Sequence, residues 1–243
     1  MKIRFLLPLI LAGCAGLAPF AAAQTLDLRE GRTNTEDGQE VDAWVTILDQ
    51  DESFARDTFE GFIKQAYSLR AERRARNVLV AQKAKIEEIS PLRGDLRAVF
   101  TSQGSGTTVA LAFSPGYDIH LNKTEYPGEL ARLGMMAKNY VKHHYNAHYK
   151  RLLADTDKKI KTRQDDINRN LGRIKRLKED IAQNEAKISA GDKQTSRLTD
   201  RNKKANESIA EMETDITNWE AEVAKFQESA SQVQASVNKV SNF

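Results

Sequence analysis

The feature that most constrains the fold is a heptad repeat in the last part of the sequence. Between residues 198 and 240, one set of positions alternates at spacings of four and three and is apolar except at Asn202: Leu198, Asn202, Ala205, Ile209, Met212, Ile216, Trp219, Val223, Phe226, Ala230, Val233, Val237 and Val240. This is the pattern of the inward positions of a coiled coil. The segment is therefore predicted to be one long helix that buries a narrow apolar stripe.

A second apolar series precedes the first. It recurs every seven residues, at Leu153, Ile160, Ile167, Ile174, Ile181 and Ile188. The positions between its members are mixed, because Leu171 and Leu177 are apolar whereas Asp157 and Gln164 are polar. This helix therefore presents a weaker seam than its neighbour.

The two series are joined by Ser189-Ala190-Gly191-Asp192-Lys193. Gly191 suits the left-handed end of a helix and Asp192 suits the cap of the next one, which favours a fold-back over one uninterrupted helix. A fold-back pairs Ile188 with Leu198, Ile181 with Ala205, Ile174 with Met212, Ile167 with Trp219 and Ile160 with Phe226. We predict an antiparallel hairpin over 128–243, with its tip near 189–193.

The residues before the hairpin read as a small head of strands and one helix. Residues 41–48 predict a strand, and a helix capped by Asp51 or Ser53 is predicted to reach about Arg76. Residues 78–89 predict one or two strands, and residues 96–101 and 107–113 predict a β-hairpin around Gly104. The predicted fold class is α+β, with a small antiparallel-sheet head over 41–127 carrying packed helices, followed by the long C-terminal hairpin. Residues 24–40 are polar and predict a flexible lead-in.

The first 23 residues have the features of a signal peptide. Lys2 and Arg4 precede an apolar run from Phe5 to Leu17, and Ala21-Ala22-Ala23 fits cleavage before Gln24. An alternative is lipidation, because Leu11-Ala12-Gly13-Cys14 resembles the lipobox of bacterial lipoproteins. Either interpretation predicts export, to the periplasm or to a lipid anchor in the outer membrane, and only lipidation at Cys14 predicts membrane attachment.

Charge and cysteine content exclude several functions. The chain has 37 basic and 34 acidic side chains, so loss of Lys2 and Arg4 lowers the formal net charge from +3 to +1. This balance argues against a nucleic-acid-binding protein, which needs a basic excess. Cys14 is the one cysteine, and its removal or acylation excludes thiol catalysis.

A histidine cluster is the best candidate for chemistry. His144 and His148 lie four residues apart, so both face one side of a helix and are candidates to share a metal ion. A third ligand would have to come from Asp118 or His120. Tyr140, Tyr145 and Tyr149 lie in the same stretch and favour the other interpretation, an aromatic junction between head and hairpin.

No catalytic constellation and no cofactor motif is found, so a non-enzymatic protein is predicted. The hairpin resembles the one in periplasmic efflux adaptors, but theirs is inserted between two halves of a lipoyl-like domain, so the resemblance covers architecture alone. We expect the hairpin to act as a spacer or to bind a protein, either a second copy or another helical partner. The predicted interaction seam is Ile209, Ile216, Trp219, Val223, Phe226, Ile167, Ile174 and Ile181. A ligand- or metal-binding module at the junction is the alternative.

Overall fold

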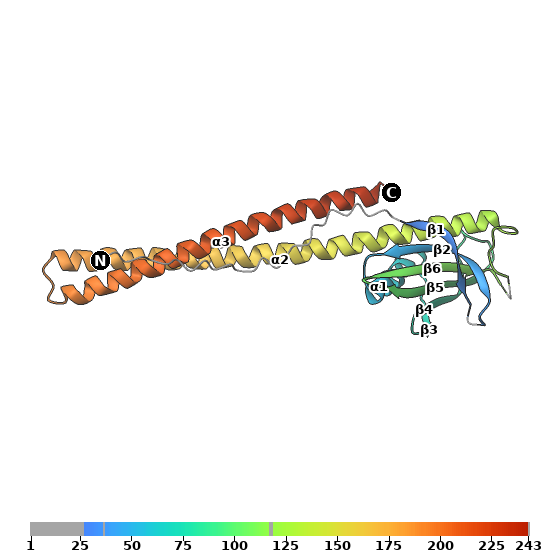
Figure 1. Cartoon of the computed structure of the whole chain (residues 1–243), viewed down its shortest axis with the longest axis horizontal. Helices are drawn as coiled ribbons and strands as arrows, with labels where there is room; N and C mark the ends of the chain where they lie inside the picture. Colours follow the sequence, from blue (N-terminus) through green and yellow to red (C-terminus); the bar gives the residue numbers. More distant parts are fainter. Residues whose placement is uncertain (1–26, 36, 117–118, 243) are drawn as a thin grey trace, which may run out of the picture.

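A computed structural model describes residues 27–35, 37–116 and 119–242. It contains a six-stranded sheet, one short helix and two long helices (Figure 1). In chain order these are β1 (Leu28–Asn34), β2 (Glu40–Leu48), α1 (Glu52–Tyr67), β3 (Glu72–Ala75), β4 (Val78–Ala84), β5 (Gly94–Gln103), β6 (Gly106–Ser114), α2 (Pro127–Ser189) and α3 (Thr195–Ser241). The predicted α+β class, with a sheet-containing head and a long helical hairpin, is confirmed.

All neighbouring strands of the sheet are antiparallel, in the order β1-β2-β6-β5-β4-β3. The predicted β-hairpin is present as β5 and β6, joined at Gly104, whose φ of 59° is left-handed. Residues 28–34, within the segment 24–40 that the sequence predicts to be a flexible lead-in, form β1. Their polar side chains are mostly exposed, so strand formation there depends on the backbone partners that β2 offers.

Helix α1 begins as predicted but ends nine residues early. The Asp51 carboxylate accepts a hydrogen bond from the Phe54 amide at 3.0 Å and caps the helix. Ser68 then adopts a left-handed conformation with φ of 56°, and the chain turns into β3 instead of continuing to Arg76. All four residues of β3 are exposed at the edge of the sheet, where charged side chains discourage pairing with another chain.

The main core lies between one face of the sheet and the two helices that cover it. Phe59 of α1 contacts Phe100 of β5 and Tyr140 of α2 edge to face, with ring centroids 6.0 and 5.3 Å apart. The same core includes Leu130, Leu133, Met136, Ala137 and Val141 of α2. Helix α2 begins at Pro127, next to the predicted boundary between residues 127 and 128, and its first turns belong to the packing of the head.

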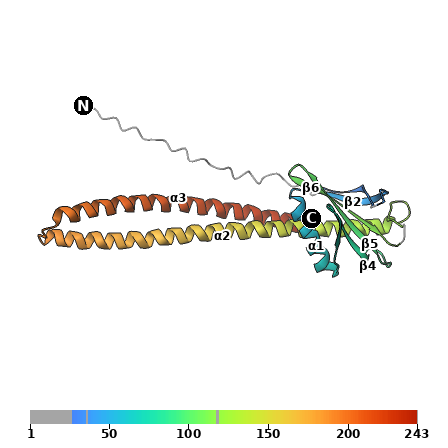
Figure 2. The same cartoon turned by 90° about the horizontal axis from the view of Figure 1, so that it is seen from below.

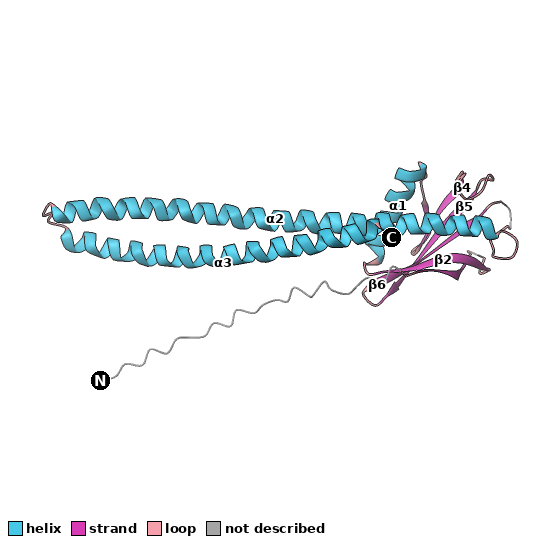
Figure 3. Cartoon of the chain, turned by 90° about the horizontal axis from the view of Figure 1, so that it is seen from above, coloured by secondary structure: helices cyan, strands magenta, loops and turns pink. Residues whose placement is uncertain are grey.

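Beyond the head, α2 continues without a break into the arm that it forms with α3 (Figures 1 and 3). Gly191 has a φ of 79° at the turn, as its predicted left-handed role requires. The predicted helix cap at Asp192 is wrong, because α3 begins at Thr195 with Gln194 as its N-cap. The Asp192 carboxylate instead accepts a hydrogen bond from the Gln194 amide at 2.7 Å within the turn. The C-terminal end of α3 lies back at the base of the arm, beside the head (Figure 2).

Gly134 is the point of closest approach between α2 and the sheet. The Trp44 indole lies directly on it, so an added Cβ would be 2.4 Å from Trp44 Cε2. Trp44 Nε1 also donates a hydrogen bond to the Leu130 carbonyl at 2.7 Å. These contacts place the large Trp44 ring against the backbone of α2, and only glycine leaves room for it.

Gly134→Ala is expected to lower the free energy of unfolding by about 1–2 kcal/mol, because displacement of Trp44 outweighs the better helix propensity of alanine. Gly172 lies on the same helix with nothing within 4 Å of an added Cβ. Gly172→Ala is therefore the matched control and should stabilise by about 0.5–1 kcal/mol. Denaturation followed by Trp44 fluorescence, in a Trp219→Phe background, measures both. Equal stabilisation by the two substitutions would contradict the packing of Trp44 on Gly134.

Candidate functional site

The arm contains most of the predicted seam residues, and they are not equally buried. Ile174, Ile209, Met212 and Ile216 form an apolar cluster, with Ile167, Leu177 and Ile181 packed against it. Trp219, Val223 and Phe226 are only half-buried. The sealed part of the seam thus lies toward the tip, and the part nearer the head is more open.

The register between the two helices agrees with the predicted pairing. Asn184 Nδ2 donates a hydrogen bond to Asn202 Oδ1 at 2.8 Å, one layer from the predicted pair of Ile181 and Ala205. Nearer the head, Lys159 Nζ lies 5.7 Å from the centre of the Phe226 ring. A hydrogen-bonded polar pair in a coiled-coil seam restricts the register, because any shift separates its members.

The seam of α2 contains two residues that the sequence pattern did not identify, Arg163 and Asn170. The residues that face α3 lie three positions after the isoleucines of the repeat, at Arg163, Asn170 and Leu177. Leu171, four positions after an isoleucine, is 50% exposed. Asn170 is only 7% exposed and makes no side-chain hydrogen bond to any other described residue. Burial of Asn202 was predictable from its place in the repeat. On α2, the sequence did not show whether the residue three or four positions after each isoleucine faces α3, and the structure decides this.

His144 lies at the junction between arm and head and is fully buried. Its Nε2 lies 2.6 Å from Gln50 Oε1, and its Nδ1 lies 2.7 Å from Thr58 Oγ1. Because Gln50 Oε1 has no proton, Nε2–H is the donor to it, and Nδ1 of the neutral ring accepts the Thr58 hydroxyl proton. His144 therefore links α2 to the start of α1 and to the loop before it. Neither partner was expected from the sequence, because both lie far from the histidine cluster along the chain.

Burial, and to a lesser extent the neighbouring His148 and His143, lower the pKa of His144 from 6.5 to about 3, while Asp51 acts in the opposite direction. Burial also lowers the pKa values of His143 and His148. The aromatic residues expected at the junction are present there. The Tyr140 hydroxyl donates to the Ala55 carbonyl at 2.8 Å, and Phe54 contacts the rings of His144 and His148. Burial raises the pKa of Tyr140.

The structure does not bring a third ligand to His144 and His148. His120 Nδ1 contacts Ser114 Oγ at the far end of the sheet, and Asp118 lies outside the described residues. Both ring nitrogens of His144 already have partners, so metal binding there would break two hydrogen bonds. Within the described ranges, no three His, Cys, Asp or Glu side chains are grouped so that they could hold a metal ion.

The end of α3 also reaches this junction. Val233 and Val240 belong to the same core as Tyr145 and Tyr149, and Val237 packs against it. The Ser236 side chain interacts with the Tyr149 hydroxyl. The end of α3 is therefore packed on α2 at the level of the junction.

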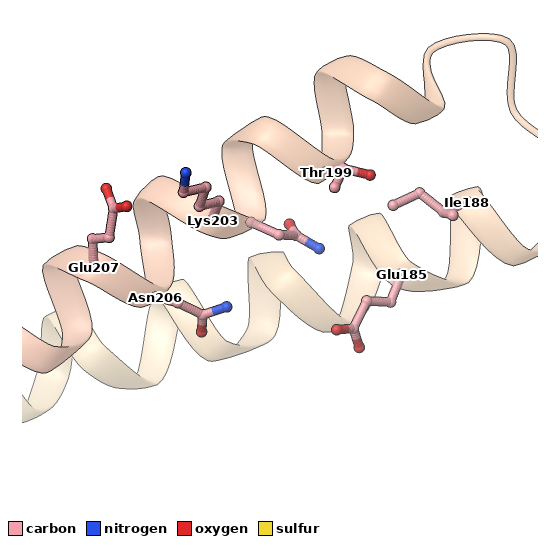
Figure 4. Close-up of a pocket in the computed structure, with 7 residues that line it drawn as sticks. Glu185, Ile188, Thr199, Lys203, Asn206 and Glu207 are labelled. Carbon is pink, nitrogen blue, oxygen red and sulfur yellow. The ribbon is translucent and has the colours of Figure 1, made fainter. Parts of the chain in front are cut away.

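A shallow open notch of about 510 Å³ lies between the helices near the tip (Figure 4). Ile188 of α2 and Thr199 of α3 lie on its two sides, and charged or amide side chains make up most of its remaining lining. It lacks the enclosed apolar walls of a small-molecule site. We therefore regard the surface of the arm, and not this notch, as the candidate functional site.

Comparisons with protein-family models, with curated proteins and with solved structures found no match for the chain. Among the residues that the structure describes, no helix is both long and apolar enough to cross a membrane. The predicted signal peptide, 1–23, and the predicted lipidation site, Cys14, lie outside the described residues.

Proposed function

We propose that this chain is an exported cell-envelope protein of structural or interaction type, without catalytic activity, whose helical arm holds a partner protein at a distance from the head. The observation that carries the proposal is the continuity of α2. This one helix packs in the core of the head through Leu133 and Tyr140 and reaches the tip at Ser189. A continuous helix couples the position of the tip to that of the head.

Two features support a rigid arm. Residues 153–189 extend about 55 Å beyond the junction at 1.5 Å per residue. The end of α3 packs on α2 beside Tyr145 and Tyr149 through Val233 and Val240, so the two helices stay in contact from the tip to the junction. A pair of packed helices bends less than α2 would alone.

Export is supported by the first 23 residues, whose charged start, apolar run and small residues before Gln24 have the order of a signal peptide. The alternative of a ligand- or metal-binding junction gains no specific support, because aromatic and histidine side chains fill the junction.

Photo-crosslinking in intact cells tests this proposal. A crosslinking amino acid at the exposed arm positions Lys161 and Lys187 is expected to form protein adducts, in protein recovered from the envelope fraction. The exposed position Glu60 on α1 is the matched control on the head and should form far fewer. Protein found only in the cytoplasm would overturn export. Absence of adducts from both arm positions, with the chain correctly exported, would overturn the role of the arm.

A further inference from the structure

Opposite charges are segregated on the two helices of the arm. Between residues 158 and 178, α2 carries a basic segment: Lys158, Lys159, Lys161, Arg163, Arg169, Arg173, Lys175, Arg176 and Lys178, against Asp165 and Asp166. Between residues 207 and 228, α3 carries an acidic segment: Glu207, Glu211, Glu213, Asp215, Glu220, Glu222 and Glu228, against Lys225. The confirmed register places these two segments side by side at the same level of the arm.

Most of this charge is not used within the hairpin. Among the described residues, two ion pairs join the helices, Arg163 with Glu222 at 2.6 Å and Lys178 with Glu213 at 3.4 Å. The remaining members of both segments make no ion pair across the seam. One edge of the arm is therefore basic and the other acidic over the same length.

The seam is also incompletely covered along this length. Trp219, Val223 and Phe226 are half-buried, and Leu171 is 50% exposed. A monomeric arm thus leaves apolar area uncovered in the stretch where its charges are segregated.

One face of the arm combines the segregated charges with the exposed Leu171. Leu171 lies on the side of the hairpin where Lys178 pairs with Glu213, because positions seven residues apart share a helix face. Glu220 lies on this side of α3, next to a row of small residues, Ala210, Thr217 and Ala224. Small side chains let another helix approach closely. Lys175, four residues after Leu171, and Lys161, two heptads before Lys175, lie on the same side of α2. We call this side of the arm the Leu171 face; it includes Lys161, Leu171, Lys175, Lys178, Glu213 and Glu220.

We propose that a second copy of this chain packs on the Leu171 face, with the two arms parallel and the basic segment of each α2 against the acidic segment of the other α3. This inference rests on the proposed function and specifies the partner. The geometry follows from symmetry. A twofold axis along the arm places each α2 over the α3 of the other copy and keeps both segments at the same level.

The alternative twofold arrangement is disfavoured by the same charges. An axis across the arm, which makes the two arms antiparallel, places α2 over α2 and α3 over α3. Like charges would then face each other along the whole contact, and such juxtaposition costs several kcal/mol. In the parallel arrangement every α2 has two antiparallel α3 neighbours, as in a four-helix bundle.

The available area is sufficient for a stable dimer. A two-helix face about 55 Å long and 20 Å wide offers about 1,000 Å² on each copy, compared with about 800 Å² per partner in a standard interface. Contact along part of the arm alone would reach the standard size.

Sedimentation of the purified exported chain tests the proposal, with a pair of charge-reversal variants. Lys161→Glu with Lys175→Glu reverses the basic side of the Leu171 face, and Glu213→Lys with Glu220→Lys reverses the acidic side. The wild type is expected to be a dimer, and each variant alone should dissociate with a dimer Kd at least about 30-fold higher at low salt. A one-to-one mixture of the two variants should form a dimer again, because the reversed segments complement each other. Circular dichroism verifies that each variant stays helical.

Arg169→Glu with Arg176→Glu is the control, because it reverses the same number of charges on the opposite side of α2. Its dimer Kd should stay within about threefold of the wild type. Equal weakening by this control would overturn the assignment of the face. A fully helical wild-type monomer would overturn the dimer, while adducts of the arm with a different protein would leave the proposed function standing.

Spin labels at the tip test the direction of packing. Lys193→Cys in a Cys14→Ser background provides a single thiol per chain. Parallel arms place the two labels about 20–30 Å apart, whereas antiparallel arms centred on the charged segments place them about 60 Å apart. The longer distance would overturn the parallel arrangement.

Discussion

Replacing Ile216 by aspartate is expected to lower the stability of the arm by about 4 kcal/mol. Ile216 is 8% exposed and lies in the cluster with Ile174, Ile209 and Met212. The nearest layer on α2 contains Asn170, which offers an amide but no positive charge. The carboxylate would be buried without an ion-pair partner, and the apolar contacts of the isoleucine would be lost as well.

The two tryptophans make this effect measurable in separate parts of the molecule. Trp219 reports on the arm, and Trp44 reports on the packing of α2 against the sheet. In the Ile216→Asp variant, the Trp219 fluorescence should change at a lower denaturant concentration than the Trp44 fluorescence. Each is measured in a protein that keeps only that tryptophan. Ala221→Asp adds the same charge at an exposed position of α3 and should shift neither transition by more than about 0.5 kcal/mol. Coincident transitions at the wild-type midpoint would contradict the burial of Ile216.

Acidification from pH 7 to pH 4 is expected to remove about 3 kcal/mol of stability through His144 alone. Its pKa falls from 6.5 to about 3 on folding, mainly because burial disfavours the imidazolium. The folded state therefore binds fewer protons than the unfolded state between these values. The contribution is fully present above about pH 6.5 and is lost progressively as the pH falls toward 3.

A non-titrating variant isolates this contribution. His144→Leu should be less stable than the wild type at pH 7 by about 2 kcal/mol, because Gln50 loses its hydrogen-bond donor and Thr58 keeps only the Phe54 and Ala55 carbonyls as partners. The difference between the two proteins should shrink or change sign by pH 4. His143, His148 and the carboxylates titrate in both proteins, so their effects cancel in the difference. A difference that does not change with pH would show that His144 titrates normally.

The hairpin was predictable because its determinants are local. A seven-residue apolar repeat, a left-handed glycine at 191 and Asp192, which bonds the Gln194 amide within the turn, each act within a few residues, and together they specify two helices and a tight turn. The pairing followed from the equal spacing of the two series about that turn. Strands β5 and β6 were predictable for the same reason, since Gly104 marks their turn.

The errors occurred where distant segments decide the conformation. Residues 28–34 carry no strong strand pattern and form β1 because β2 offers an open edge. Residues 72–75 were assigned to the end of a helix and instead pair with β4. On α2, the choice between Asn170 and Leu171 as the seam position depends on the rotation of the helix against α3. Such rotation is set by packing over the whole arm and not by the local sequence.

The amino-acid sequence by itself determined an antiparallel helical hairpin, the location of its tip and the register of its seam, because helix periodicity and turn chemistry are local properties of the chain. Only the tertiary structure decided that α2 begins inside the head, that His144 is bonded to Gln50 and Thr58, and that α3 returns to pack beside Tyr149. Those features arise from contacts between residues far apart in the chain, whose identity depends on how the sheet and helices stack. The same stacking aligns the basic and acidic segments and thereby defines the face on which we expect a second copy to bind.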